Sequence, residues 1–232
     1  MKNTVLKIAS SLLMIIGYSQ LFAQECVPYY LVEKGAVREM ASYDKKDKLT
    51  GTSIQTVKEI KTTGNKTEWT IGTVSKDDKG KEIASGDLHM SCEEGIFKMD
   101  MKNFIDEATL KGFEGMEITM DATDLDYPAD LSVGQTLKDG SITVKATNAG
   151  MTMMNMVVKI YDRKVEALES ITTPAGTFSC YKMTSTIETK TMFTMVAKST
   201  EWMARKVGPV RSETYDKSGK LMGYTMLTSM KQ

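Results

Sequence analysis

The stretch SITVKATNAGMTMMNMVVKI, from Ser141 to Ile160, holds two runs of apolar residues with a turn signal between them. In the first run Ile142, Val144 and Ala146 alternate with polar residues. This period of two places one face of a strand in a core and the other in water. The polar sequence TNAG, which ends at Gly150, has the composition and length of a hairpin loop. The stretch therefore predicts two neighbouring antiparallel strands.

The second run of this stretch carries apolar residues on both of its faces. One face holds Met154, Met156, Val158 and Ile160, and the other holds Met151, Met153 and Val157. A strand of this kind is typical of a sheet that is covered on both sides. We therefore predict that this strand is covered on both faces.

Strand patterns and turn signals dominate the rest of the chain. The sequence MEITMDAT, from Met116 to Thr123, repeats the period of two. Polar loops of hairpin length separate other strand-like runs, at Asp44–Lys48, Thr62–Asn65, Lys76–Lys81, Glu93–Gly95, Thr147–Gly150 and Asp216–Lys220. Because short loops join antiparallel neighbours, the sequence predicts a mostly β protein with an antiparallel sheet.

One segment departs from the strand period. In MKNFIDEATLKG the apolar residues that recur at helical steps are Met101, Phe104, Ile105 and Ala108. Asp100 can act as the N-cap and Gly112 can end the helix, whereas Leu110 and Phe113 fall off the apolar stripe. The pattern predicts a helix of two or three turns that lies on a sheet face or plugs an opening.

The N-terminus has the layout of a secretory signal peptide. Lys2 and Lys7 precede an apolar run from Ile8 to Phe22, and the small residue Ala23 follows. The run is too short and too interrupted for a membrane-spanning helix, and no later segment is as long. We predict cleavage after Ala23, a mature single domain at residues 24–232 without a transmembrane span, and a periplasmic or secreted location. A lipid anchor at Cys26 is not expected, because Gln24 and Glu25 replace the small residues that such an anchor requires.

Charge gives little indication of a partner. The 30 basic and 30 acidic residues balance, and removal of the predicted signal peptide, which holds two lysines and no acid, leaves a formal charge of −2. Such a chain is neither basic nor acidic enough to suggest a polyanion or a membrane surface as partner. We therefore expect no nucleic-acid partner.

Three cysteines remain after export to an oxidising compartment, so one is left over from any pair. Cys26 and Cys92 flank strand patterns of the N-terminal half, and we expect them to form the disulfide. Cys180 lies inside a strand, beside Phe178 and without a nearby histidine or second cysteine, which favours a packing role over a reactive thiol. The alternative is three reduced, buried thiols.

The residues that could support catalysis are few. His89 is the only histidine, so any histidine-dependent triad or metal site must use it. The sequence DATDLDYPAD groups Asp121, Asp124, Asp126 and Asp130, but it lacks the glycine and final glutamate of an EF-hand loop. We expect no cofactor, no metal and no enzymatic activity, and we interpret His89 as a surface or core residue.

Methionine is unusually frequent, with 19 methionines against 6 phenylalanines. Methionine side chains adapt to irregular gaps and to varied apolar partners. Their abundance is compatible with an adaptable apolar cavity, but we favour a core that uses methionine in place of leucine and phenylalanine. Their alternation along strands is a packing pattern rather than a soft-metal site.

The C-terminal third resembles a known bacterial family. The sequence TPAGTFSCYKM, from Thr173 to Met183, is followed by a tryptophan strand, by VGPVR at Val207–Arg211 and by a last hairpin. These features resemble the periplasmic domain-of-unknown-function family numbered 3108 and its TapB-like relatives. The opening CVPYYLVEKGAVREM, from Cys26, is similar to the start of such proteins.

The resemblance implies a strongly curved antiparallel sheet, a half-barrel or barrel, with one or two short helices near its mouth. It is similar to the sheets of periplasmic lipoprotein carriers, and a Gram-negative periplasm fits. We expect a non-enzymatic cell-envelope protein that binds an apolar or lipid-like molecule on the concave face. Met154 and Met156 would line that face, and the segment around Phe104 and Ile105 would form its lid. The alternative is a structural or assembly module that docks another envelope protein.

Overall fold

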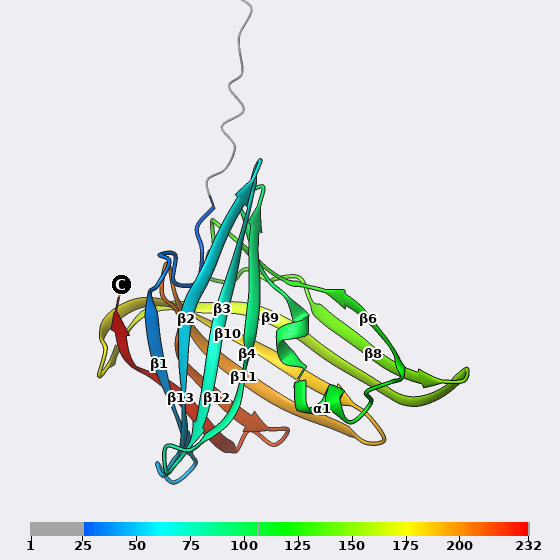
Figure 1. The fold of residues 1–232 in the computed structure, drawn as a ribbon. Helices are drawn as coiled ribbons and strands as arrows, with labels where there is room; N and C mark the ends of the chain where they lie inside the picture. The colour runs from blue at the N-terminus through cyan, green and yellow to red at the C-terminus, as the bar shows by residue number, and fades with distance from the viewer. Residues whose placement is uncertain (1–25, 106, 232) are drawn as a thin grey trace, which may run out of the picture.

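The computed structural model describes residues 26–105 and 107–231, so the predicted signal peptide and its cleavage site lie outside the described residues. The strands of this part form one antiparallel sheet (Figure 1). They are β1 (Val37–Asp44), β2 (Leu49–Thr63), β3 (Lys66–Asp77), β4 (Glu82–Glu93), β5 (Ile96–Met99), β6 (Glu117–Thr123), β7 (Leu125–Pro128), β8 (Gly140–Asn148), β9 (Met151–Thr173), β10 (Gly176–Lys190), β11 (Thr194–Ala204), β12 (Gly208–Asp216) and β13 (Leu221–Lys231). The mostly β, antiparallel fold expected from the sequence is confirmed.

The sheet curves until it nearly closes on itself. Its strand order is β6-β8-β9-β10-β11-β12-β13-β1-β2-β3-β4-β5-β7. The two edge strands, β6 and β7, are consecutive in the chain and separated by Asp124 alone. One bent stretch of chain therefore contributes to both edges, and the sheet stays open only between β6 and the part of β4 that β5 does not cover. The expected barrel-like curvature is confirmed.

The hairpin of β8 and β9 forms in the predicted place, around Ala149 and Gly150. Ile142, Val144 and Ala146 are completely buried, as their alternation requires. The expectation that β9 is covered on both faces is wrong at its start, since Met151 and Met153 are exposed. Their face of the sheet meets no second layer there, because the strands extend beyond the curved core.

The predicted helix is two shorter pieces: η1 (Met101–Phe104), a 3₁₀ helix, and α1 (Glu107–Lys111). Asp100 is the N-cap, and its carboxylate accepts a hydrogen bond from the Lys102 amide at 2.8 Å. Ile105 is extended, with φ −103° and ψ 118°, so the single continuous helix that we predicted is wrong. The extended backbone lets Met101 and Ile105 both reach the core. In the described part of the chain, no helix has the length and apolar composition needed to cross a membrane.

Two apolar clusters hold the sheet in its curved form. The larger one fills the inner face and includes Tyr29, Trp69, Phe97, Tyr127 and Val165. The rings of Phe97 and Tyr127 pack beside that of Tyr29, with centroid–centroid distances of 6.4 and 6.0 Å. The smaller cluster lies on the opposite face and includes Met40, Cys180, Trp202, Val210 and Leu227.

The VGPVR motif supplies the hydrogen-bond acceptors of a buried arginine. The guanidinium of Arg38, from β1, donates hydrogen bonds to the carbonyls of Val207 at 2.6 Å and Pro209 at 2.5 Å. Gly208 has φ +98°, and a Cβ there would come within 2.4 Å of Arg38 Nη1. Arg38 also lies over the ring of Tyr30, 5.1 Å from its centroid. The motif therefore joins the start of β12 to β1 through a desolvated charge that has two carbonyl acceptors.

Candidate functional site

An apolar groove lies at the opening of the sheet, between β4 and the segment formed by η1, α1 and β6. Its volume is about 400 Å³, within the size range of small-molecule sites. The large apolar side chains that line it are Leu88 on β4, Ile105 just after η1, Leu110 on α1 and Met120 on β6. Polar residues, among them Asp87 and Lys102, also line it. The arrangement suits an apolar molecule with a polar end.

The register of the sheet places the groove residue Met120 in an apolar row of the inner face. Met120 on β6 pairs with Val144 on β8, which pairs with Met156 on β9. Directly paired residues share a face, so the three side chains form one apolar row on the inner side of the sheet. In the next row Ala146 lies between Ile118 and Met154.

The predicted binding residues are distributed over two hollows. Ile105 lines the groove, whereas Phe104, which is 41% exposed, lines a second hollow on the inner face. Met154 and Met156 are half-buried against the inner cluster and line neither hollow. In one continuous helix Leu110 would lie off the apolar face formed by Met101, Phe104, Ile105 and Ala108. The break at Ile105 resets the helical phase, and Leu110 lines the groove.

The second hollow is small and has a carboxylate in its wall. Its volume is about 40 Å³, room for one or a few water molecules. Apolar residues such as Met183 and Ile187 line it together with Glu201, Arg163 and Tyr127. The concave face is therefore mostly filled by side chains, and the apolar volume lies at the opening of the sheet instead.

Burial raises the pKa of two acidic groups in this second hollow, Glu201 and Tyr127. Desolvation raises the pKa of Glu201, and the positive charge of Arg163 opposes that rise. Arg163 donates to the carbonyls of Lys138 at 2.5 Å and Asp126 at 3.3 Å, and it lies over the Tyr127 ring, 4.7 Å from the centroid. Burial raises the pKa of Tyr127 to about 12. Nothing in the sequence pattern marked Glu201, because a glutamate inside an alternating strand usually faces water.

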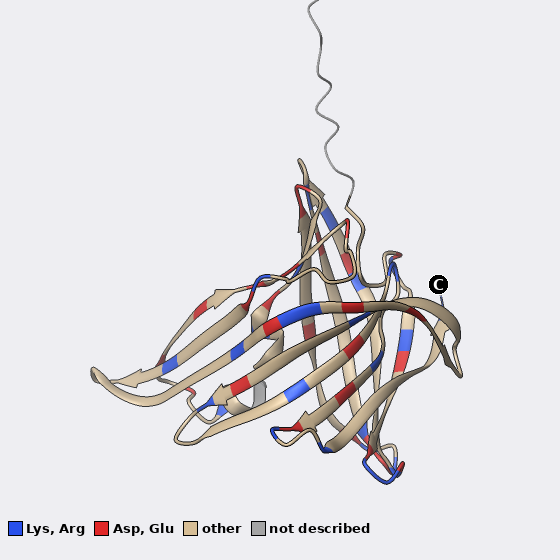
Figure 2. Ribbon diagram, turned by 180° about the vertical axis from the view of Figure 1, so that it is seen from behind, with Lys and Arg blue, Asp and Glu red and all other residues tan. Residues whose placement is uncertain are grey.

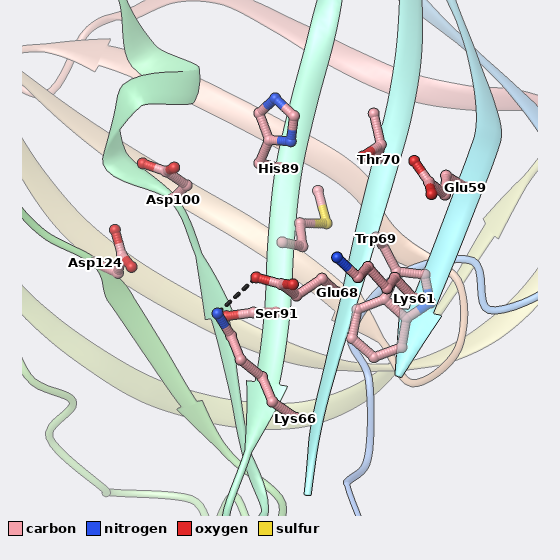
Figure 3. A pocket seen from close by; sticks show the side chains of 11 residues that line it. Glu59, Lys61, Lys66, Glu68, Trp69, Thr70, His89, Ser91, Asp100 and Asp124 are labelled. Carbon is pink, nitrogen blue, oxygen red and sulfur yellow. Dashed lines mark hydrogen bonds and ion pairs between the residues drawn. The ribbon is translucent and has the colours of Figure 1, made fainter. Parts of the chain in front are cut away.

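A third hollow, of about 310 Å³, lies over β2, β3 and β4 and contains His89 (Figure 3). It is lined by charged side chains, including the ion pair of Lys66 with Glu68 at 2.6 Å. Hydrogen bonding to Lys66 lowers the pKa of Glu68. His89 is exposed, and among the described residues no hydrogen bond joins its imidazole to another side chain. The Asn103 side chain instead pairs with the backbone of His89 at 2.8 and 2.9 Å, where β4 has no further strand.

Two aspartates of the DATDLDYPAD stretch have structural partners. Asp124 accepts a hydrogen bond from the Met101 amide at 3.1 Å, which ties the bend between β6 and β7 to η1. Asp126 forms an ion pair with Lys138 at 3.6 Å. Within residues 26–105 and 107–231, no three metal-ligating side chains group together.

The cysteines have the arrangement that the sequence favoured. Cys26 and Cys92 are joined by a disulfide, which ties the start of the described chain to β4. Cys180 is free and completely buried. Burial, with a smaller contribution from Glu169, raises its pKa to about 11, so the thiol is neutral at physiological pH.

Comparison with known proteins agrees with this architecture. The family pattern of the DUF3108-like proteins matches residues 33–227, from before β1 into β13. The chain belongs to the DUF3108-like family. No curated protein matches the chain.

Two solved structures have a similar fold. One, from Parabacteroides distasonis ATCC 8503, is described as a candidate lipoprotein; it is 26% identical, with a TM-score of 0.73, over 90% of this chain and all of that one. The other, from Bacteroides fragilis NCTC 9343, is described as a candidate exported protein with a YmcC-like fold; it is 23% identical, with a TM-score of 0.71, over 89% of this chain and all of that one. The comparisons agree with the family resemblance in the C-terminal third.

Proposed function

We propose that this member of the DUF3108-like family is a non-enzymatic exported protein that binds a lipid-like molecule in the groove between β4 and the η1–α1–β6 segment. The observation that supports this proposal most strongly is the groove itself, with about 400 Å³ of space and side chains of Leu88, Ile105, Leu110 and Met120 on its walls. An acyl chain would bury against these side chains, and a polar headgroup would lie beside Lys102 and Asp87.

Export is part of the same proposal. Its support is the signal-peptide layout of residues 1–23, the disulfide between Cys26 and Cys92, and the two similar structures described as a candidate lipoprotein and a candidate exported protein. Disulfides persist in oxidising compartments such as the periplasm.

A pair of variants on one strand tests ligand binding. Leu88 lines the groove, whereas Ile83, at the start of β4, does not line it and is 64% exposed. Leu88→Trp fills the groove, whereas Ile83→Trp adds the same bulk in solvent. The probe is the fluorescent fatty acid cis-parinaric acid. Because the larger side chain would displace part of its acyl chain from the groove, we expect Leu88→Trp to weaken binding by about tenfold or more. Ile83→Trp is expected to bind as the wild type does.

The result that contradicts the proposal is equally clear. If both variants bind the probe with the affinity of the wild type, the probe binds outside the groove. If the wild type does not bind the probe, the proposal is wrong. Native mass spectrometry of protein purified from its own host then identifies any molecule that copurifies.

The free border of β4 supports a second candidate function, the docking of an envelope protein. Residues 82–88 of β4 pair with β3 and, among the described residues, with no strand on their other side. An unpaired border of this kind can accept a strand from a partner. A photo-crosslinker at Ser85 should then give one defined protein adduct in the envelope, and a crosslinker at Thr214, on the doubly paired strand β12, should not. Adducts to lipid alone would favour the first function.

A further inference from the structure

The ends of two neighbouring hairpins expose apolar side chains that do not line the groove. The β8–β9 end exposes Met151 at 66% and Met153 at 54%, and the β10–β11 end exposes Met192 at 90%, Phe193 at 77% and Met195 at 67%. Strand β9 pairs with β10 as far as Val157 and Lys190, so the two ends lie side by side, at the right of Figure 1. We call residues 146–158 and 191–197 together the hairpin tips.

Both tips are uncharged and bounded by lysines. Residues 146–158 hold no charged side chain and lie between Lys145 and Lys159; residues 191–197 hold none and lie between Lys190 and Lys198. Figure 2 shows the ends of both hairpins without blue or red. All four lysines are exposed. The acidic residues nearest the tips in the sheet, Glu117, Glu188 and Asp216, are fewer than the four lysines and leave a positive balance.

Alternation places the four lysines on one face of the sheet. Lys145 pairs with Asn155, and Lys159 pairs with Glu188. Lys198 pairs with Thr186, on the same face of β10 as Lys190. Each lysine therefore projects away from the inner cluster, behind the apolar end of its own strand.

The apolar side chains of the tips point to both faces. Met153 lies opposite in phase to Met154, which faces the inner cluster, whereas Met195 pairs with Thr189 on the inner side. A groove on a partner protein would cover one face of a hairpin. A medium that surrounds the ends on every side satisfies both faces, and a lipid bilayer is such a medium.

The spacing of apolar ends and lysines fits the depth of a bilayer interface. Three residues separate Lys145 from the β8–β9 turn and four separate Lys198 from the β10–β11 turn, which is roughly 10–13 Å of extended strand, while Lys190 adjoins its turn and Lys159 lies eight residues from its own. Interfacial segments bury their apolar side chains about 5–10 Å deep, while lysines stay at the level of anionic headgroups. Within the β10–β11 turn, the Thr191 amide donates a hydrogen bond to the Phe193 carbonyl at 3.0 Å, so this backbone group already has a partner inside the turn.

We propose that the hairpin tips insert into the interfacial layer of an anionic lipid bilayer, with Met151, Met192 and Phe193 among the acyl chains and the four lysines at the headgroups. This docking uses different residues from those of the groove and does not depend on what the groove binds.

Vesicle binding of the exported protein tests the proposal. The protein is purified after export, with its N-terminus determined by mass spectrometry, so that an uncleaved leader does not produce the binding. Co-sedimentation is measured with vesicles of equal phosphatidylcholine and phosphatidylglycerol, and with phosphatidylcholine alone. We expect Met192→Ser with Phe193→Ser to weaken binding to the mixed vesicles by about tenfold or more. The matched control, Leu168→Ser with Met222→Ser, removes side chains that are 54% and 55% exposed elsewhere and should bind as the wild type does.

A reporter at the tip shows insertion directly. The natural tryptophans, Trp69 and Trp202, are each 7% exposed and give a constant background. Brominated lipid should quench the tryptophan of Phe193→Trp and leave that of Met222→Trp unchanged. Lys190→Gln with Lys198→Gln should reduce the preference for anionic vesicles by about fivefold per lysine.

Two outcomes overturn the proposal. If the serine variant of the tip binds as well as the wild type, the membrane contact lies elsewhere. If the wild type binds neither kind of vesicle, the tips meet a protein surface instead. Neither outcome affects cis-parinaric acid binding, so failure here and failure of the groove can be told apart.

Discussion

The two sides of this sheet differ in how completely the chain covers them. On the closed side, β12, β13, β1 and β2 each have a partner strand on both sides, and Arg38 is buried against the carbonyls of Val207 and Pro209. On the open side, part of β4 has one partner strand only, and two short helical pieces stand where a strand would complete the barrel. Apolar side chains are buried on the first side and line a groove on the second.

This difference separates what maintains the fold from what is available for binding. A buried guanidinium with fixed acceptors tolerates little change, since each lost contact leaves a desolvated charge without a partner. An open border with half-buried Leu110 and Met120 can change its side chains at low cost to the fold. The closed side should therefore be sensitive to single substitutions and the open side tolerant of them.

The largest expected effect is that of Gly208→Ala, on the closed side. The new Cβ would lie 2.4 Å from Arg38 Nη1 and 3.0 Å from the Tyr30 ring, at φ +98°. Backbone strain and a steric clash with a buried charge add, and we expect a loss of about 4 kcal/mol or more in the free energy of unfolding. Urea denaturation measures it.

Gly219→Ala is the matched control for this substitution. Gly219 has φ +84°, and a Cβ there meets no atom within 4 Å. Its substitution should cost about 1 kcal/mol, the strain alone. If the two variants lose the same free energy of unfolding, the clash with Arg38 costs nothing beyond backbone strain. The contrast between the two sides of the sheet would then be wrong.

A smaller effect is expected from loss of the disulfide, which pins the start of the described chain to the open side. Cys26 and Cys92 are 66 residues apart in sequence, and removing both by Cys26→Ala with Cys92→Ala should lower the free energy of unfolding by about 3 kcal/mol. Hydrogen exchange should rise in β4 and β5 and stay low around Arg38. Uniform loss of protection would instead mean that the two sides unfold as one unit. Cys180→Ala controls for removal of a cysteine without a bond.

Most of the fold could be predicted, because local patterns carry it. The alternation of Ile142, Val144 and Ala146 and the turn at Gly150 specify a hairpin wherever they occur. The helix break at Ile105 could not be predicted, because contacts with the core, and not the local sequence, decide whether a residue is helical or extended there. The exposure of Met153 depends on how far β9 extends beyond the core, which the sequence pattern does not encode.

The site was predicted only in part, and the reason is distance along the chain. Ile105, which we predicted to be part of a lid over the concave face, lines the groove, and Leu88 and Met120 join it there only because the sheet curves. The motif at Val207–Arg211 was recognisable as a family feature, yet its partner Arg38 lies 169 residues from Val207. Net charge gave no sign of the hairpin tips, because four lysines in one place disappear in a balanced total.

The smallest expected effect concerns Glu201, in the second hollow between the two sides. Burial raises its folded-state pKa above the ordinary value of 4.5, so the folded protein holds this proton more tightly than the unfolded chain does. Ionisation of Glu201 therefore lowers stability as pH rises from 4.5 through the folded-state pKa. Glu201→Gln removes this loss. The variant should gain stability relative to the wild type over that window and keep the gain at neutral pH.

The sign of this pH dependence can be checked against a surface carboxylate. The pKa of Glu166 is lowered, mainly by its hydrogen bond with Lys164, so its contribution to stability is present above 4.5 and is lost as pH falls. Glu166→Gln should therefore show a slight loss, rising with pH, where Glu201→Gln shows a gain. Denaturation curves collected across this range separate the two. If Glu201→Gln also loses stability with rising pH, the ionised carboxylate is stabilised by Arg163 more than burial penalises it, and the second hollow is a charge-paired interior rather than a desolvated one.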